Sequence, residues 1–338
     1  MTRKLHVAVA GATGAVGEEF LRLLDERNFP LASLRLLASS RSAGKSLPFR
    51  GERMAVEELT DASFDGIDLA FFSCGGDRAR RYVPSARKSG AVVVDNSSAF
   101  RMDPTVPLVV PEINADAANA HQGVLAVPNC TTIVFLMAAA PLHREAKLRR
   151  AVVCSYQATS GAGRAAMEEY DEQVKLAARG EPLVSRVLPR VIHGNVVPQV
   201  DVFLPDGSTK EEKKLHEETR KILGDSSVCV AATCVRVPVR RAHSVSAALE
   251  FERPLSVERA VELLRAFPGV VVVDGGEPPV YPTPLDASGR LEVLVGRVRG
   301  DTTEGNCLLL WSVGDQLLKG AAWNAVQIAE LLVGRALL

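Results

Sequence analysis

Apolar residues in the first 130 positions of the chain gather in short runs that end at Gly, Ser or Asp. These runs predict buried strands at 5–10, 34–38, 67–73 and 91–95. Mixed apolar and charged segments at 18–25 and 77–89 predict amphipathic helices. Because strands that alternate with helices form a parallel sheet with helices on its faces, the pattern predicts a doubly wound, Rossmann-like α/β domain.

The rest of the chain follows a different pattern. Leu183 to Asp206 has no clean period and predicts no regular structure, and Asp301 to Asn306 predicts a hairpin turn. A helix at 320–332 has a broad apolar surface, which favours packing back onto the first domain. We therefore expect a first domain of residues 1–128 and 315–338, and a second, α+β domain of residues 129–314. The other elements predicted in this half are strands at 150–156, 228–238, 245–251 and 308–313, and helices at 164–179 and 209–224.

One stretch carries a candidate nucleophile. Pro128 and Asn129 stand immediately before an apolar run that continues to Ala140 and predicts a buried helix. Asn is a preferred helix N-cap, so we expect Cys130 in the first helical turn. There the helix dipole and the unpaired backbone N–H groups favour the thiolate over the thiol. The alternative is that Cys130 is a small residue of the core.

A glycine-rich loop joins the first predicted strand to the first predicted helix. Its glycines, Gly11, Gly14 and Gly17, have the spacing GxxGxxG rather than GxGxxG. Glycines at this place let a dinucleotide pyrophosphate approach the backbone and the helix N-terminus. The position between strand and helix favours a dinucleotide site over a tight turn without a ligand.

The end of the second predicted strand indicates which dinucleotide is bound. The segment begins with Ser39, Ser40 and Arg41, and no Asp or Glu stands there. An acidic residue would bind the ribose hydroxyls of NAD, whereas hydroxyl groups with an Arg suit the 2′-phosphate of NADP. The sequence therefore favours NADP over NAD and over a surface loop without a ligand.

Other candidate residues stand at predicted strand ends. Cys74 precedes two glycines in a loop that should pass close to the cofactor, although we expect the thiol itself to be inert. Arg101 could hold a phosphate or carboxylate, but an Arg of this kind is more often a solvated surface residue. Gln157 opens a second glycine-rich turn, which suits either a ligand contact or an ordinary strand–helix connection. His243 follows two arginines at a strand start and is the best partner for a cysteine nucleophile.

A charged helix is predicted after the capping box that begins at Thr209. Glu211 and Lys214 lie three residues apart and share one face of this helix. By itself, this pattern describes a solvated helix.

Composition argues against several classes of function. The 40 basic and 40 acidic residues cancel, which gives no electrostatic case for a nucleic-acid or membrane partner. No apolar segment reaches the roughly 20 residues that span a bilayer, and the first residues lack a signal-peptide pattern, so we expect a cytoplasmic protein. Six cysteines without a CxxC pair argue against a zinc site and a disulfide framework, and we expect all except Cys130 to fill the core.

Taken together, these motifs resemble the bacterial-type aspartate-semialdehyde dehydrogenase family along nearly the whole chain. Several motifs in one order are more specific than any single one. The resemblance rests on GATGAVG from Gly11, SSRSAGK from Ser39, FRMDPTVPLVVPEIN from Phe100, PNCTT from Pro128, SYQATSGAG from Ser155, KEEKK from Lys210, RVPVRRAHS from Arg236 and GDQLLKGAAWNAVQIAE from Gly314.

The resemblance implies a homodimeric, NADP-dependent enzyme whose second domain serves catalysis and dimerisation. It implies that Cys130 is the nucleophile that becomes an acyl-thioester, that Asn129 helps to position the substrate, and that His243 is the acid/base residue. Gln157 would orient the substrate at the thiol. The remaining substrate ligands implied are Arg236 for the carboxylate, Arg101 and Lys214 for the phosphate and Glu211 for the amine. The implied cofactor residues are Gly11, Thr13, Gly14, Ala15, Val16, Ser39, Ser40, Arg41, Ser73, Ser160, Gly161 and Gln316.

Two features depart from the family's pattern. Gln316 stands where Asn is expected in many relatives, which affects the expected nicotinamide contact. Cys74 and Asp77 flank the glycine pair where Ala and Ser are frequent. Neither change concerns the nucleophile.

The implied reaction is the reversible, NADPH-dependent reductive dephosphorylation of L-aspartyl-4-phosphate to L-aspartate-4-semialdehyde, a step toward lysine, threonine, methionine and isoleucine. A thiol suits it because a thioester accepts hydride while it tethers the substrate. One alternative is N-acetyl-glutamyl-phosphate reductase, whose substrate has a blocked amine. Because a carboxylate facing the amine favours a free ammonium, Glu211 favours the aspartyl substrate over this alternative. The other is an NADP-binding paralogue without catalysis, against which the presence of both Cys130 and His243 argues.

Overall fold

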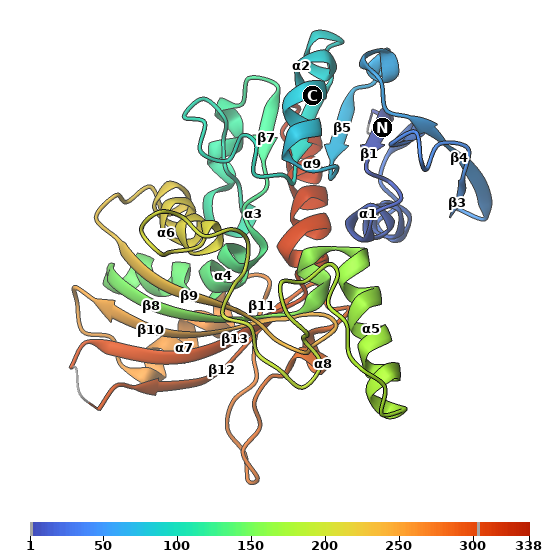
Figure 1. The fold of residues 1–338 in the computed structure, drawn as a ribbon. Helices are drawn as coiled ribbons and strands as arrows, with labels where there is room; N and C mark the ends of the chain where they lie inside the picture. Colours follow the sequence, from blue (N-terminus) through green and yellow to red (C-terminus); the bar gives the residue numbers. More distant parts are fainter. Residues whose placement is uncertain (1–2, 303–304) are drawn as a thin grey trace. The chain divides into compact units, whose positions relative to one another are not determined.

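The chain forms two compact units in a computed structural model that describes residues 3–302 and 305–338 (Figure 1). The first unit comprises Met1–Asn129 and Ala321–Leu338, and the second comprises Cys130–Gly320. The expected boundaries were 128/129 and 314/315, so the structure moves six residues from the first domain to the second at the later crossing. The first unit is therefore built from both ends of the chain.

The first unit contains a seven-stranded sheet in the order β3-β4-β2-β1-β5-β6-β7. Every pair except β3–β4 is parallel, which confirms the expected doubly wound sheet. The central strands β1 and β5 are short and, apart from the exposed His6, consist of buried apolar residues, so both faces of the sheet are covered there. The strands are β1 (Leu5–Ala10), β2 (Leu31–Ala38), β3 (Ser46–Phe49), β4 (Glu52–Glu58), β5 (Leu69–Phe72), β6 (Val92–Asp95) and β7 (Val124–Ala126).

Helices α1 (Ala15–Glu26) and α2 (Gly76–Lys88) lie where the sequence pattern predicts them. Helix α1 leads from β1 to β2 and α2 leads from β5 to β6, and these two crossovers move outward from the centre of the sheet in opposite directions. Because such crossovers are right-handed, the two helices cover opposite faces. The strand order reverses between β1 and β5, which is where ligands bind in open α/β sheets. Shorter helices α3 (Pro111–Asn114), η1 (Asp61–Phe64) and η2 (Ala115–Ala120) complete the connections.

The predicted parallel sheet has an antiparallel addition at one edge, which the sequence pattern did not predict. Strands β3 and β4 form an antiparallel hairpin beside β2, with Ser46 opposite Ala55 and Phe49 opposite Glu52. The hairpin is mostly exposed and rich in charged side chains, so it has no apolar run that would reveal it. Such charged side chains also suit an edge strand, because they oppose pairing with another chain.

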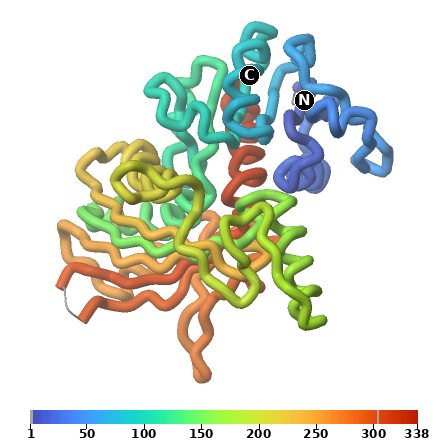
Figure 2. Tube along the Cα trace, in the orientation of Figure 1, coloured from blue at the N-terminus to red at the C-terminus, as the bar shows by residue number. Residues whose placement is uncertain are grey.

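The C-terminal helix α9 (Trp323–Gly334) packs in the first unit, as its apolar surface predicted. Asn324 donates to the backbone carbonyl of Val109 (2.9 Å), and Arg27, which follows α1 directly, pairs with Glu330 (2.9 Å). Figure 2 shows this last, red segment within the first unit. The helix was expected from residue 320, but residues Leu318–Ala322 instead form a π-helical turn, η4, that precedes it.

The second unit contains a six-stranded mixed sheet in the order β11-β12-β13-β10-β8-β9. The pairs β8–β9 and β11–β12 are parallel, and the other three are antiparallel. The predicted turn at 301–306 joins β12 to β13 and includes residues 303 and 304, which lie outside the described residues. The strands are β8 (Leu148–Gln157), β9 (Cys229–Arg236), β10 (His243–Phe251), β11 (Val270–Val272), β12 (Val293–Gly300) and β13 (Cys307–Gly314).

One face of this sheet is covered by helices and the other is partly open. Helix α4 (Cys130–Ala146) lies against β10, with α6 (Lys210–Leu223) beside β9 and α7 (Val257–Ala266) beside β11 and β12. Helix α5 (Arg164–Ala178), the short helix α8 (Pro284–Ala287) and the turn η3 (Thr159–Ala162) complete the unit. The segment 183–206 contains no helix or strand, as predicted, apart from isolated bridges at Val197 and Phe203. A hairpin-like loop around Gly275 and Val280, orange in Figure 2, extends from the same unit.

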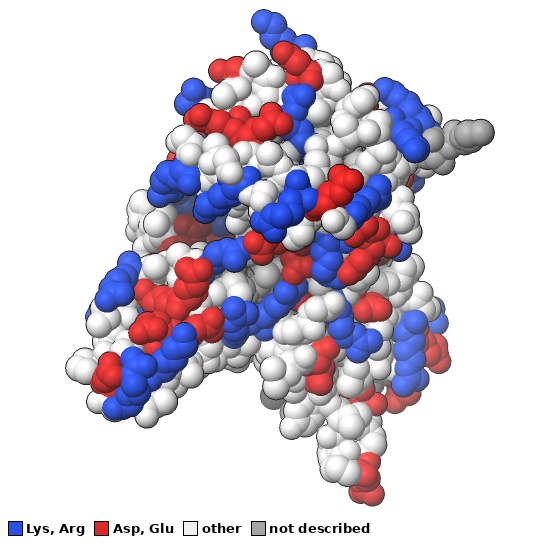
Figure 3. Space-filling model, turned by 90° about the vertical axis from the view of Figure 1, so that its right-hand side faces the viewer, with Lys and Arg blue, Asp and Glu red and all other residues white. Residues whose placement is uncertain are grey.

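The charge distribution, the burial of the cysteines and the length of the helices can each be compared with what the sequence predicted. Basic and acidic side chains are interspersed on the face drawn in Figure 3, in keeping with a net charge of zero. The expectation that five cysteines fill the core is wrong for Cys229, which is exposed at the start of β9. Among the described residues, no helix combines the length and the apolar character needed to cross a bilayer.

Candidate active site

The glycine loop of the first unit has the shape of a phosphate cradle. A Cβ atom on Gly11 would lie 2.3 Å from the carbonyl oxygen of Ser73, and one on Gly17 would lie 2.3 Å from that of Gly11. The backbone therefore passes too closely at these points for a side chain. Gly14 caps α1 without any side-chain hydrogen bond, while Thr13, Ala15 and Val16 are partly exposed. This bare helix N-terminus fits a dinucleotide pyrophosphate.

The residues expected around the adenosine end lie at neighbouring strand ends. Ser39, Ser40 and Arg41 follow β2 in a turn closed by a bond from the Ser42 N–H to the Ser39 carbonyl (2.8 Å), and Arg41 is exposed. Ser73 follows β5, which pairs with β1. Burial raises the pKa of the neighbouring Cys74 thiol to about 12, so it is not a nucleophile at neutral pH.

Arg101 is buried rather than solvated, which corrects the interpretation from its loop position alone. Its guanidinium donates to the backbone carbonyls of Val127 and Asn96, at 2.8 Å each. These bonds fix the planar group within the first unit at the carboxyl end of β6. Asn129, also buried, is the last residue of the first unit, immediately before Cys130.

Cys130 is the first residue of α4, as the capping pattern predicted. The helix is buried from Thr131 through Leu142, so its axis and dipole are fixed by the core on which it packs. The Cys130 side chain itself is only partly buried, and its Sγ lies 4.0 Å from Thr131 Oγ1. The thiol is therefore held at a helix N-terminus and remains accessible to a reagent.

The ends of four strands, β8, β9, β10 and β13, lie at the same end of the second sheet. They bring the other predicted residues together. Gln157 ends β8 opposite Arg236, which ends the parallel strand β9. His243 begins β10, and its partner Gly314 ends β13. Residues that are 79 and 86 positions from Gln157 along the chain thus become its neighbours through strand register. The sequence pattern placed each at a strand end but did not specify this pairing.

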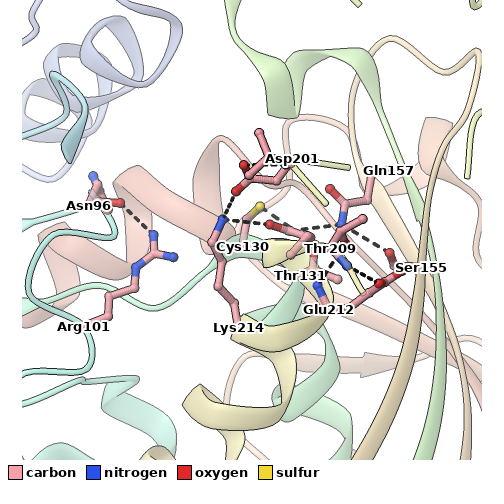
Figure 4. Close-up of polar contacts among 12 residues, drawn as sticks. Asn96, Arg101, Cys130, Thr131, Ser155, Gln157, Asp201, Thr209, Glu212 and Lys214 are labelled. Carbon is pink, nitrogen blue, oxygen red and sulfur yellow. Dashed lines mark hydrogen bonds and ion pairs between the residues drawn. The ribbon is translucent and has the colours of Figure 1, made fainter. Parts of the chain in front are cut away.

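Glu211 is the centre of a hydrogen-bonded network in this unit. Only 3% of its surface is exposed. Its Oε1 accepts from Gln157 Nε2 (3.1 Å) and Thr131 Oγ1 (3.3 Å), and its Oε2 accepts from Lys214 Nζ (3.1 Å). Figure 4 labels these three partners, Thr131, Gln157 and Lys214. The solvated helix that the isolated pattern describes is therefore wrong for this face. The shared face predicted for Glu211 and Lys214 is confirmed.

Lys214 is held as a cation by two carboxylates. Burial alone would lower its pKa, but Glu211 and Asp201, whose Oδ2 lies 2.8 Å from Nζ, together raise it. Asp201 belongs to the irregular 183–206 segment, and nothing in the sequence identified it. The carboxylates of Glu211 and Asp201 keep Lys214 positively charged throughout the physiological pH range, as a phosphate ligand requires.

His243 is fully buried, and its hydrogen bonding defines its tautomer. The Ala158 N–H donates to Nδ1 (3.0 Å), so the proton of the neutral ring resides on Nε2. Nε2 has no hydrogen-bond partner among the described residues. Burial lowers the pKa of His243 to about 3, with Arg236 adding to the effect and Glu211 opposing it. The ring thus presents a buried, unsatisfied N–H donor at neutral pH.

Arg236 lies beside this imidazole. It is 6% exposed, and its Nη1 donates to the Ala158 carbonyl (2.7 Å). Burial lowers its pKa, against the influence of Glu211 and Cys130. A Cβ on Gly161 would lie 2.8 Å from the His243 ring and 3.0 Å from Arg236 Nη1, so glycine is required to cover both side chains. Ser160, just before it, bonds to Gln316.

Gly320 is a site residue that sequence reasoning missed. It lies in the π-helical turn, and a Cβ there would lie 2.8 Å from Cys130 Cβ. Replacing it by Ala is expected to displace the nucleophile and to lower kcat/KM roughly tenfold to a hundredfold, because an error of about 1 Å costs that much. Steady-state rates of the variant, with Gly334→Ala as a control whose Cβ meets open space, test this expectation. A fully active Gly320→Ala enzyme would contradict it.

Sequence comparison shows the family of this chain. Residues 6–121 match the family described as semialdehyde dehydrogenase, NAD binding domain, and residues 139–319 match semialdehyde dehydrogenase, dimerisation domain. The chain is 49% identical over 335 residues to the aspartate-semialdehyde dehydrogenase of Synechocystis sp., with 99% of both sequences covered.

Solved structures agree with the sequence comparison. Aspartate semialdehyde dehydrogenase II from Vibrio cholerae, complexed with ASA, has a TM-score of 0.96 at 41% identity, covering 98% of this chain and 99% of that chain. The Candida albicans enzyme with NADP has a TM-score of 0.78 at 26% identity, covering 99% and 100%. The chain therefore belongs to the semialdehyde dehydrogenase family, among the aspartate-semialdehyde dehydrogenases.

Proposed function

We propose that this protein is an NADP-dependent phosphorylating aldehyde dehydrogenase that converts L-aspartyl-4-phosphate and NADPH reversibly to L-aspartate-4-semialdehyde, phosphate and NADP⁺, in the biosynthesis of aspartate-family amino acids. The observation that carries the proposal is the accessible Cys130 thiol at the start of α4, beside the Glu211 network. The family relationship supports the substrate assignment. We further expect the reaction to take place in the cytoplasm.

Cys130 performs the covalent steps. Its thiolate attacks the C4 carbonyl, and the bond from that carbon to the phosphate oxygen breaks. The leaving phosphate takes the one proton that the overall reduction consumes. Bound NADPH supplies the hydride that reduces the thioester. Collapse of the resulting thiohemiacetal forms the aldehyde and returns the thiolate.

His243 acts on the carbonyl oxygen. Its Nε2–H is the donor without a partner, and its Nδ1 is engaged by the Ala158 N–H. A donor in a buried site stabilises the negative charge that develops on oxygen in each tetrahedral state. The acid/base residue expected from the family is thus proposed to work as a hydrogen-bond donor, while the helix dipole of α4 favours the thiolate.

The polar ends of the substrate are matched by charge. Glu211 is proposed for the ammonium and Arg236 for the carboxylate, with Gln157 orienting the acyl group and Asn129 helping to position it. Lys214 and Arg101 are each proposed as phosphate ligands. A free ammonium suits Glu211, whereas the N-acetyl group of the alternative substrate would leave this carboxylate facing a neutral amide.

For the cofactor, we propose the glycine loop and the neighbouring strand ends. The cradle at Gly11 and Gly17, too tight for any Cβ, and the uncapped start of α1 support binding of the pyrophosphate. Arg41 and the two serines before it support NADP over NAD. The set proposed is Gly11, Thr13, Gly14, Ala15, Val16, Ser39, Ser40, Arg41, Ser73, Ser160 and Gly161. The family resemblance adds Gln316, whose amide is already engaged by Ala242 and Ser160.

The function is tested by a spectrophotometric assay of the purified protein in the direction of NADPH formation. L-Aspartate-4-semialdehyde with phosphate and NADP⁺ is expected to be turned over, with little activity when phosphate is omitted or NAD⁺ replaces NADP⁺. Activity on N-acetyl-glutamate semialdehyde instead would assign the alternative reductase. Binding of NADP⁺ without turnover of either aldehyde would identify a non-catalytic paralogue.

We also propose a homodimer that forms through the open face of the second sheet. The dimerisation-domain match supports the assembly, and the exposed apolar residues of β8 support the surface. Val152 and Tyr156 are each 38% exposed on this face, and Tyr156 packs against Trp311 with ring centroids 5.4 Å apart. Aromatic side chains of this kind are enriched in interfaces between proteins.

Val152→Arg is expected to convert the dimer to a monomer, because it places a charge at the centre of an apolar contact. Sedimentation at micromolar protein concentration gives the mass directly. Met102→Arg, at a 47% exposed apolar residue of the first unit, is the control and should remain dimeric. A Val152→Arg protein that also remains dimeric would exclude this face.

A further inference from the structure

The two residues that precede His243 are each held by a side chain from the segment after β13. Arg241 Nε donates to the carboxylate of Asp315 (2.6 Å), and the Ala242 N–H donates to Gln316 Oε1 (2.8 Å). Ala242 has φ of +72°, a left-handed conformation that is unfavourable for a residue with a Cβ. The backbone that delivers His243 to its place is therefore strained and depends on outside support.

Asp315 is itself firmly fixed. Its side chain is fully buried and accepts from the backbone N–H groups of Gly289 (2.7 Å) and Leu317 (3.0 Å) as well as from Arg241. A buried carboxylate with several donors is a rigid acceptor. Its position follows from strand pairing, since Gly314 lies opposite His243 in the sheet.

The other end of the Gln316 amide reaches the opposite side of the imidazole. Gln316 Nε2 donates to Ser160 Oγ, and the next residue, Gly161, is the one whose Cβ would collide with the His243 ring. Gln316 is 2% exposed. One side chain thus joins the strained turn before His243 to the turn that covers its ring.

We propose that Asp315 and Gln316 form a clamp that positions His243 with its Nε2–H directed at the reacting carbonyl oxygen. The role of His243 rests on the proposed function, and the clamp itself rests on the contacts above. Gln316 would then be a positioning residue, since its amide oxygen and one amide N–H are already engaged within the second unit. This reading differs from the nicotinamide contact implied by the family resemblance, and the two predict different effects of the same substitution.

Gln316→Leu tests the clamp, because leucine keeps much of the volume and removes both hydrogen bonds. We expect kcat to fall roughly tenfold or more, while the Kd for NADPH, measured by fluorescence titration, stays within about twofold of the unmodified protein. Gln316→Asn, which is too short to reach both Ala242 and Ser160, should lie between the two. If Gln316→Leu does not fold, Gln316→Asn provides the test of the clamp in its place.

A matched control exists in the same unit. Gln173 in α5 is 1% exposed and engages both ends of its amide, donating to the Val184 carbonyl and accepting from the Ile192 and His193 N–H groups. Gln173→Leu therefore removes a comparable buried network without touching the segment before His243. It should lower stability while leaving kcat and the His243 signal unchanged.

A second readout is independent of turnover. With ¹⁵N-labelled histidine, six imidazoles give a tractable NMR spectrum. The unmodified protein should show His243 as the neutral Nε2–H tautomer throughout pH 5 to 8. In Gln316→Leu we expect a mixture of tautomers or a titration within that range, as the ring moves relative to Arg236 and Glu211, the charged groups that act on it.

The outcomes separate the hypotheses. A weaker Kd for NADPH with an unchanged His243 spectrum would overturn the clamp and assign Gln316 to the cofactor. Unchanged kcat and an unchanged spectrum would overturn it as well. If the unmodified protein lacked the proposed activity, the NMR comparison would still decide whether the clamp holds the ring.

Discussion

Cys130→Ser is expected to lower kcat for phosphate-dependent oxidation of L-aspartate-4-semialdehyde by about 10³-fold or more, which corresponds to roughly 4 kcal/mol of activation free energy. The helix N-terminus stabilises a thiolate, but a serine hydroxyl is far too weak an acid for the same field to ionise it at neutral pH. An ester is also a poorer hydride acceptor than a thioester. Both effects act on the chemical step, so KM should change less than kcat.

Intact-protein mass spectrometry tests the covalent step directly. Incubation with the acyl phosphate in the absence of NADPH should add one aspartyl group to the unmodified protein and none to Cys130→Ser. Cys229→Ser is the control, because Cys229 is exposed but lies outside the proposed machinery. Full activity of Cys130→Ser, or an adduct on another cysteine, would exclude Cys130 as the nucleophile.

His243→Ala is expected to lower kcat by about 10²- to 10³-fold, the usual cost of removing one donor to a developing oxyanion. His243→Gln can place an amide N–H where Nε2 lies and should therefore recover a measurable part of the loss. Steady-state kcat and KM of the two variants provide the comparison. If the Gln variant were as slow as the Ala variant, proton transfer rather than hydrogen bonding would be the role of His243.

Because the pKa of His243 is depressed, we expect this residue to make the stability of the protein depend on pH. Its pKa is about 3 in the folded protein, against 6.5 for an unperturbed His. Between these values the unfolded chain binds the additional proton, so this residue makes the free energy of unfolding rise with pH from about 3 to 6.5 and level off above. Chemical denaturation of the unmodified protein and of His243→Gln across this range should show a smaller slope in the variant. The acidic limb of kcat/KM should likewise have no component near pH 6.5 from this ring.

The sequence predicted well those elements whose signals, such as a helix cap or an apolar run, lie within the element itself. Helix α4 followed from a cap and an apolar run, and α6 from the capping box at Thr209, where the Glu212 carboxylate accepts the Thr209 N–H. In contrast, the β3–β4 hairpin is exposed and charged, and its strands exist because they extend an edge of the sheet. No local period marks such strands.

The residues of the site likewise divide into those that a local sequence pattern predicts and those that only tertiary contacts define. Cys130, Gln157 and His243 could be proposed from strand ends and a helix start. The burial of Glu211 could not, because it results from contact with Thr131 and Gln157, which are 80 and 54 residues away. Gly320 and Asp315 are likewise defined by neighbours, Cys130 and Gly289, that only the folded chain brings to them. Tertiary contact, rather than composition, gives these residues their roles.

The return of α9 to the first unit has a consequence for synthesis. A ribosome releases the amino-terminal strands long before it reaches Trp323, so the nascent cofactor-binding unit must wait for the last segment of the chain. Until then, the surface that Val326, Ile328 and Leu332 later bury is open to solvent and to chaperones. A chain that stopped before Trp323 would thus lack a packing element of the part of the protein that was made first.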